Sequence, residues 1–227
     1  MPSPFLYLTL TTLPLATTAL YLHHLHSSLT KNVHCHTTPH LQSPSLSLPA
    51  SIPRDGSTHL IMHERATKVV PTPALPRYPD PRAILTTYLR HNMVAFSRYP
   101  PAWMLYFAIS DVGVRKTFSA PYLTSLNYEI GDLVNGVYRV ITRTDSKVEM
   151  LFDPPRSYRG PAVTGLLAVE IREEGEQTVF VNDTVMWREK GGKAVVLEGK
   201  VGRWTHEIIA AGLVEGGTKW LMEEGTR

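Results

Sequence analysis

The sequence predicts an α+β domain in which a curved, mainly antiparallel sheet is covered by a long C-terminal helix. Strand-like runs joined by short turns follow one another from residue 137 to 198, which is typical of an antiparallel meander. One amphipathic helical pattern precedes these runs, and a longer one follows them. The 227 residues suffice for one such domain with an N-terminal extension.

The composition is that of an ordinary globular protein, with 43% hydrophobic and 19% charged residues. The formal net charge is only +3, and acidic residues are interleaved with Lys and Arg in the C-terminal half. A nucleic-acid-binding protein would carry a basic stripe, so nucleic acid is excluded as the expected partner. Cys35 is the single cysteine, so an intrachain disulfide is excluded as well.

The N-terminal segment is hydrophobic and uncharged. Residues Phe5–Leu22 read FLYLTLTTLPLATTALYL, and the first charged side chain is Lys31. A bilayer-spanning helix needs about 20 such residues, and Tyr7 and Tyr21 stand where interfacial aromatic rings occur. We therefore predict a transmembrane anchor over residues 5–22 and a single-pass protein of an endomembrane. A cleaved signal peptide, which would need a basic start, and a disordered Thr-rich tail are the alternatives.

Residues 23–79 have the composition of a tether that is rich in Pro, Ser and His. Seven of the ten histidines lie between His23 and His59, but a metal site needs ligands held in fixed geometry, which such a segment does not supply. We therefore expect no metal and no cofactor. The short run His59–Met62 has the composition of a strand that would add to the domain.

The folded domain is expected over residues 80–227. It begins with a helix, because Asp80 is a suitable N-cap, Pro81 fits the first helical position, and an apolar stripe follows up to Phe96. The apolar run 103–109 is expected to form a core strand or a short buried helix. The strand-like runs are residues 137–143, 148–152, 162–172, 177–187 and 194–198.

A helix over residues 201–222 completes the chain. Trp204, Ile208, Ile209, Leu213 and Trp220 lie toward one side of it. Two known architectures combine a sheet and a helix in this way, the START-like helix-grip fold and the hot-dog fold. Both enclose an apolar pocket between the sheet and the helix.

Three phrases in the C-terminal half carry a resemblance to a group of proteins. They are GDLVNGVY at Gly131–Tyr138, VNDTVMWR at Val181–Arg188 and LEGKVGRWTH at Leu197–His206. Over about the last hundred residues the chain resembles small, membrane-anchored accessory proteins encoded in fungal polyketide biosynthetic clusters. The resemblance implies a part in secondary metabolite biosynthesis, either by releasing, hydrolysing or cyclising a hydrophobic intermediate or by holding it. It carries over no catalytic residue, so whether the chain is an enzyme stays open.

A nucleophile elbow, a P-loop and a dinucleotide fingerprint are all lacking from the sequence. Any chemistry would therefore be acid–base or electrostatic, performed by polar groups that face an apolar pocket. Asp183 is one candidate, since alternation along 179–187 puts it on a face with three valines and a tryptophan. On that face, burial would raise the pKa of its carboxyl group. The alternative register turns Asn182 and Thr184 inward and leaves Asp183 in solvent.

His206 and Arg203 are the other candidates for catalysis. His206 lies near the start of the last helix, where its imidazole could reach the pocket mouth as acid or base. Arg203 would bind a carboxylate or carbonyl oxygen, or else form a surface ion pair. Asn182 begins a glycosylation sequon that lies inside a predicted strand, where a glycan is disfavoured. The alternatives to an enzyme are a lipophile-binding or scaffolding module and a membrane-tethered interaction protein.

Overall fold

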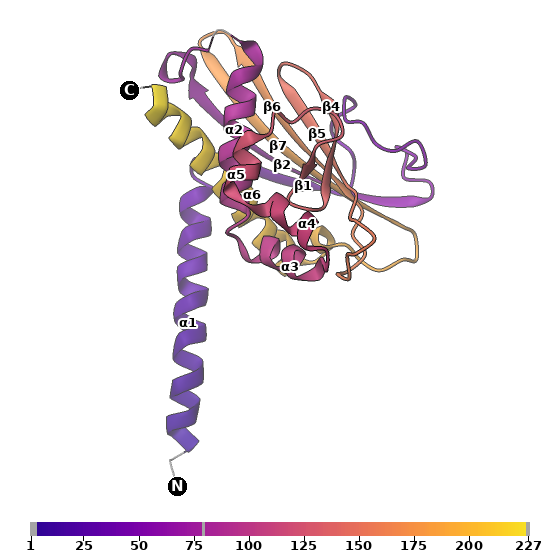
Figure 1. Ribbon diagram of the computed structural model, residues 1–227. Coiled ribbons are helices and arrows are strands. Elements are labelled where there is room, and N and C mark those ends of the chain that lie inside the picture. The colour runs from indigo at the N-terminus through magenta and orange to yellow at the C-terminus, as the bar shows by residue number, and fades with distance from the viewer. Residues whose placement is uncertain (1–3, 79, 226–227) are drawn as a thin grey trace.

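The computed structural model describes residues 4–78 and 80–225, with the backbone alone for residues 4–16 (Figure 1). Its centre is an antiparallel sheet with the strand order β1-β2-β7-β6-β5-β4-β3. The strands are β1 His34–Thr38, β2 His59–Pro71, β3 Leu133–Val134, β4 Tyr138–Arg143, β5 Lys147–Phe152, β6 Gly165–Glu174 and β7 Gln177–Glu189. The α-helices are α1 Pro4–Leu29, α2 Pro81–Phe96, α3 Pro100–Ala108, α4 Val112–Arg115, α5 Ala120–Ser125 and α6 Lys200–Gly225. Three short 3₁₀ helices are η1 Thr72–Ala74, η2 Lys116–Phe118 and η3 Val196–Glu198.

This architecture confirms the α+β class, the antiparallel sheet and the long C-terminal helix. The start of α2 is also as predicted, because Asp80 accepts a hydrogen bond from the backbone N–H of Arg82 at 2.8 Å and Pro81 occupies the first turn. The apolar run at 103–109 falls mainly in helix α3, which is one of the two expected alternatives, but this helix is not buried as expected, since Trp103 and Phe107 are exposed. A second expectation is corrected, because residues 194–198 form a loop and η3 in place of a strand.

Residues 23–79, expected to form a tether, contribute two strands to the sheet. Strand β2 lies between β1 and β7 and pairs with β7 along its whole length, so it is central to the domain. The polar composition of this segment is compatible with a central strand because the charged side chains of β2 have partners. Arg65 binds Asp183, Lys68 binds Glu215 and Glu64 binds His206. The strand expected at His59–Met62 is confirmed as the start of β2.

Helix α1 projects from the domain and touches it only near its C-terminal end (Figure 1). There, the imidazole of His26 lies 3.4 Å from the Glu207 carboxylate of α6. Leu29 packs against the apolar cluster that contains Ala211 of α6. Across the described residues, no helix combines the length and apolar character that crossing a bilayer requires. The anchor over residues 5–22 stays a prediction.

The two faces of the sheet are covered differently. The helix face packs against α2, α5 and α6, with Phe180 and Met150 of the sheet buried against Tyr88 and Leu221 (Figure 1). The loop face is covered by residues 39–58, whose Leu46 and Ile52 pack against Trp187. Each face therefore has its own apolar core, and β7 supplies side chains to both.

Candidate functional site

A cavity of about 90 Å³ lies on the helix face, between the sheet and α6. This space holds several water-sized groups. The cavity is lined by Met93, Phe96, Tyr138, Phe152, Val163, Gly165, Leu166, Leu167, Asn182, Thr184, Val185, Met186, His206, Ile209, Ala210 and Leu213. Most of these residues are apolar, and a few polar groups converge among them, which is the usual make-up of a small-molecule site.

His206, which lines the cavity, is paired with Glu64, which lies behind the cavity wall. Nδ1 of His206 lies 2.6 Å from Oε1 of Glu64, whose side chain is 1% exposed. The other carboxylate oxygen of Glu64 accepts a long hydrogen bond from the Thr37 hydroxyl, at 3.4 Å. Because a carboxylate only accepts, Nδ1 of His206 carries the proton and donates it in this bond. The bond fixes the tautomer and the orientation of the ring.

Ordinary periodicity brings this pair together. In β2, alternation turns Met62, Glu64 and Ala66 toward α6. In α6, His206, Ala210 and Leu213 recur at helical spacing and line the same cavity. The imidazole is half-buried, with 22% of its side chain exposed. Within the part of the chain that the structure describes, the hydrogen bond of His206 is made by Nδ1 alone, so Nε2 is available to a ligand.

Asp183 lies on the loop face, away from the cavity. Its Oδ1 accepts hydrogen bonds from Nε2 of His63 at 2.8 Å and Nε of Arg65 at 2.7 Å, and its Oδ2 accepts one from the Arg65 guanidinium at 2.9 Å. This corrects the prediction that Asp183 lines the apolar pocket. The alternative register, with Asn182 and Thr184 turned inward, gives the observed face.

The environment of Asp183 also differs from both expectations. The residue is 3% exposed, because residues 39–58 cover it, and the Gln42 backbone N–H donates to Nδ1 of its partner His63. Burial alone would raise the pKa of the Asp183 carboxyl group. The hydrogen bonds from His63 and Arg65 outweigh burial and hold that pKa below its usual value. A carboxylate with both oxygens occupied in this way is a structural group.

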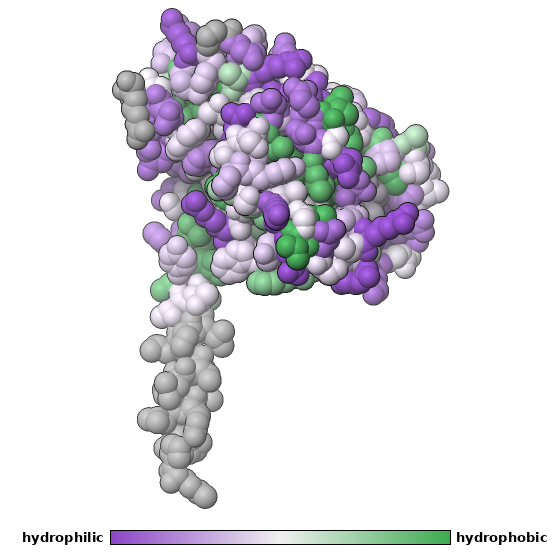
Figure 2. Space-filling view, viewed as in Figure 1, coloured by the Kyte–Doolittle hydropathy of each residue, from purple (hydrophilic) through white to green (hydrophobic). Residues whose placement is uncertain are grey.

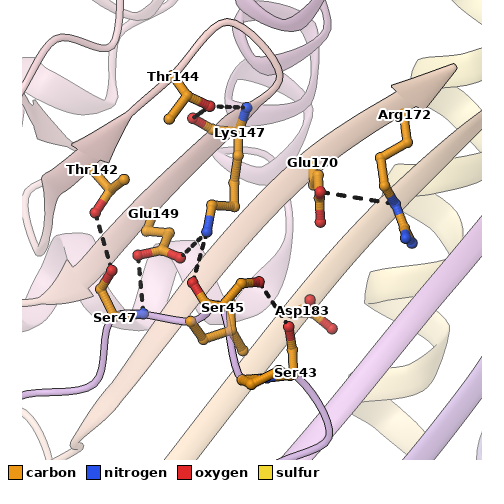
Figure 3. A network of polar contacts seen from close by, with 12 residues as sticks. Ser43, Ser45, Ser47, Thr142, Thr144, Lys147, Glu149, Glu170, Arg172 and Asp183 are labelled. Carbon is orange, nitrogen blue, oxygen red and sulfur yellow. Dashed lines mark hydrogen bonds and ion pairs between the residues drawn. The ribbon is translucent and has the colours of Figure 1, made fainter.

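A second polar cluster on the loop face fixes the covering segment (Figure 3). Glu149 is fully buried, and it accepts hydrogen bonds from the Lys147 ammonium at 2.8 Å and from the Ser47 backbone N–H at 3.2 Å. The Lys147 ammonium also donates to the Ser45 carbonyl oxygen at 2.8 Å. The loop face is therefore held by satisfied buried charges.

Arg203 and Asn182 have structural surroundings too. Nε of Arg203 donates to the Leu197 carbonyl oxygen at 3.2 Å, which ties η3 to the first turns of α6. Arg203 does not line the cavity, so its predicted part in catalysis is unsupported. Asn182 is 8% exposed and lines the cavity. A glycan at Asn182 would have to occupy the interior of the folded domain, so the sequon is buried.

The geometry disfavours a thiol nucleophile and offers no metal site among the described residues. Burial raises the pKa of the Cys35 thiol to about 12, and the carboxylates of Glu207 and Glu64 add to this effect. A thiolate nucleophile is therefore disfavoured at neutral pH. Among the described residues, no three His, Cys, Asp or Glu side chains are placed to share a metal ion.

Glu64 is the residue of the candidate site that the sequence interpretation missed. It lies in the range expected to be a tether, where a carboxylate carries no signal. The alternation along β2 does contain a signal, because it puts Glu64 on the same face as the apolar residues Met62 and Ala66.

Comparisons with protein families, with characterised proteins and with solved structures gave no match. Function is therefore inferred from the cavity, its polar groups and the residues that hold them.

Proposed function

We propose that the domain binds a small hydrophobic molecule in the cavity and that His206, held by Glu64, acts on it as a general acid–base. The 2.6 Å contact between a buried carboxylate and a cavity-lining imidazole carries this proposal. The sequence resemblance suggests that the ligand is a polyketide-type intermediate. The reaction would then be its release, hydrolysis or cyclisation.

The proton transfer proposed for His206 follows from the position of its ring proton. With its proton on Nδ1, His206 presents a lone pair at Nε2 and can remove a proton from water or from a carbon next to a carbonyl group. The buried Glu64 carboxylate then stabilises the imidazolium, which returns the proton to the leaving group or to the new hydroxyl. Asn182 and Thr184 also line the cavity and offer hydrogen bonds to a ligand oxygen.

A non-catalytic lipophile-binding domain is the second candidate, and the mostly apolar lining of the cavity favours it. Both candidates agree with a helix-grip arrangement. We favour this arrangement over the hot-dog fold because α6 follows the meander of strands and closes the helix face. In either function the cavity between sheet and helix is the ligand site.

Deleting the gene and identifying the accumulated intermediate supplies the ligand for the test. Complementation with His206→Ala or Glu64→Gln is expected to leave that intermediate unconverted, because removing a general base slows a reaction by roughly 10²- to 10⁴-fold. His34→Ala is the matched control, since His34 is an exposed histidine of β1. It is expected to restore the product, as measured by mass spectrometry of culture extracts.

Binding separates the two candidates. The purified intermediate should raise the melting temperature of the wild-type protein and of His206→Ala. If both His206→Ala and Glu64→Gln restore the product, the acid–base function is excluded and the binding function is left. An unchanged wild-type melting temperature would count against both.

A further inference from the structure

Helix α3 exposes a compact group of large apolar side chains. Trp103, Met104 and Phe107 are 52%, 67% and 73% exposed, and Val112 of α4 is 67% exposed. Positions 103, 104 and 107 lie on one side of a helix. The other side of α3 is occupied, since Ala102 is fully buried. We call Trp103, Met104, Phe107 and Val112 the α3–α4 patch.

The patch continues into a shallow groove on the same surface. Trp103 and Phe107 form one part of the groove with Tyr106 and Phe118, which also line its extension beside Val112. In Figure 2, apolar side chains appear over α3 and α4 at the lower edge of the domain. Contiguous apolar surface of this kind marks an interaction site in a folded protein.

Basic side chains adjoin the patch. Arg115 and Lys116 line the groove, and the Arg115 guanidinium lies 5.1 Å from the centre of the Tyr106 ring. The acidic residue nearest in sequence is Asp111, whose carboxylate caps α4 by accepting the backbone N–H groups of Gly113 and Val114. Exposed aromatic side chains with a basic rim are typical of surfaces that meet anionic lipid headgroups.

A second element exposes apolar side chains at the same end of the domain. Helix α1 extends past the end where α3 lies (Figure 1). Leu20 and Tyr21 of α1 are 70% and 64% exposed, and no Lys, Arg, Asp or Glu precedes Lys31 in the chain. Two elements from distant parts of the sequence therefore present apolar side chains on one side of the molecule.

We propose that the α3–α4 patch docks onto the surface of an anionic lipid bilayer. Trp103, Met104 and Phe107 would enter the interfacial layer, where amphipathic aromatic rings are favoured. Arg115 and Lys116 contact lipid phosphates at the rim. This surface is separate from the cavity, and the proposal does not depend on the function of His206.

The test places an environment-sensitive nitrobenzoxadiazole label at Phe107→Cys in the full-length protein. Val69→Cys is the matched control, because Val69 is an exposed apolar residue of β2, 49% exposed, near the opposite end of the sheet. The label is read with phosphatidylcholine vesicles, with and without phosphatidylserine. Unsubstituted protein reports the background from Cys35, whose raised pKa slows labelling.

With phosphatidylserine vesicles, the label at position 107 is expected to shift to the blue and to be quenched by spin-labelled lipid, while the label at position 69 is unchanged. Lys116→Glu should weaken vesicle association at least roughly fivefold, the effect expected for one charge near an anionic surface. Unchanged emission at position 107 would overturn the proposal. So would a shift that appears without vesicles and grows with protein concentration, since it would identify a second copy as the occupant.

Discussion

The helix face and the loop face of the sheet each hold a pair of one histidine and one buried carboxylate. On the helix face, His206 contacts Glu64 at 2.6 Å, and on the loop face, His63 contacts Asp183 at 2.8 Å. The pairs differ in what else their atoms touch. His63 has both ring nitrogens bonded, and Asp183 also binds Arg65, whereas His206 lines a cavity and keeps Nε2 available.

This difference separates a structural pair from a candidate catalytic one. A buried charge pair is retained when every partner is satisfied, and it then fixes the packing around it. Proton transfer needs one ring nitrogen that a ligand can reach. Burial and short distances are therefore shared by both faces, and access to a cavity distinguishes them.

The largest expected effect is on the loop face. Asp183→Asn should lower the free energy of unfolding at pH 7 by about 3 kcal/mol, because it disrupts a buried pair with Arg65 and His63. The pKa of Asp183 is lowered in the folded state, so its stabilisation is present above about pH 4, the usual aspartate value, and is lost as the pH falls through the folded pKa. Denaturant unfolding at pH 7 and pH 3 measures this.

Asp153→Asn is the control for that measurement, because Asp153 forms an exposed pair with Arg139. Such a pair contributes at most about 1 kcal/mol. If both variants lose the same stability at pH 7, the loop-face pair has no special structural role and the comparison between the faces fails.

The second effect concerns close packing on the helix face. A Cβ atom at Gly217 of α6 would lie 2.6 Å from Cε2 of Tyr88 and would also meet the Asn92 side-chain oxygen. Gly217→Ala should therefore cost about 2 kcal/mol by overpacking α2 against α6. Gly216→Ala is the neighbouring control, since nothing lies within 4 Å of its Cβ position, and it should gain about 0.5 kcal/mol from helix propensity. Thermal unfolding distinguishes them, and similar melting temperatures would contradict the packing argument.

A smaller effect is expected for the coupling energy between the histidine and the carboxylate of the helix-face pair. A double-mutant cycle with Glu64→Gln and His206→Gln should give a coupling energy of about 1 kcal/mol. The equivalent cycle with Asp183→Asn and His63→Gln should give a larger value, because that pair is more deeply buried. A reversed order would indicate that the helix-face pair is primarily structural.

The smallest effect is expected at the edge of the loop-face network. The Thr142 hydroxyl donates to the Ser47 hydroxyl at 3.4 Å in a solvent-exposed position. Thr142→Val should change the free energy of unfolding by less than about 0.5 kcal/mol in denaturant unfolding, as surface substitutions usually do. A loss above 1 kcal/mol would show that the rim of the network, as well as its buried Glu149, holds the covering segment.

The sequence allowed the prediction of features that depend on local pattern. The capped start of α2 at Asp80, four of the five expected strands of the meander and the C-terminal helix follow from periodicity and turn residues. The position of His206 near a pocket followed from its place on that helix. These signals lie within one element and its immediate neighbours.

Features that depend on distant partners could not be predicted in this way. Glu64, Arg65 and Lys68 are charged residues in a central strand, and only their partners in β7 and α6 make that burial favourable. The face of Asp183 was ambiguous because both faces of β7 are buried, so hydrophobic alternation no longer marks one of them. Residues 39–58, which cover the loop face, show no helical or strand periodicity, so their packing on the sheet could not be predicted.

The pairing of β2 with β7 also has a consequence for synthesis of the chain. Arg65 and Asp183 are 118 residues apart, so a ribosome must add 118 residues after Arg65 before this pair can form. Until then, β2 has an open edge, and the apolar helix face lacks the cover of α6, which follows all of the strands in the chain. Unpaired edges and exposed apolar surface favour aggregation of nascent chains. We therefore expect this protein to depend on chaperones that shield its N-terminal half during translation.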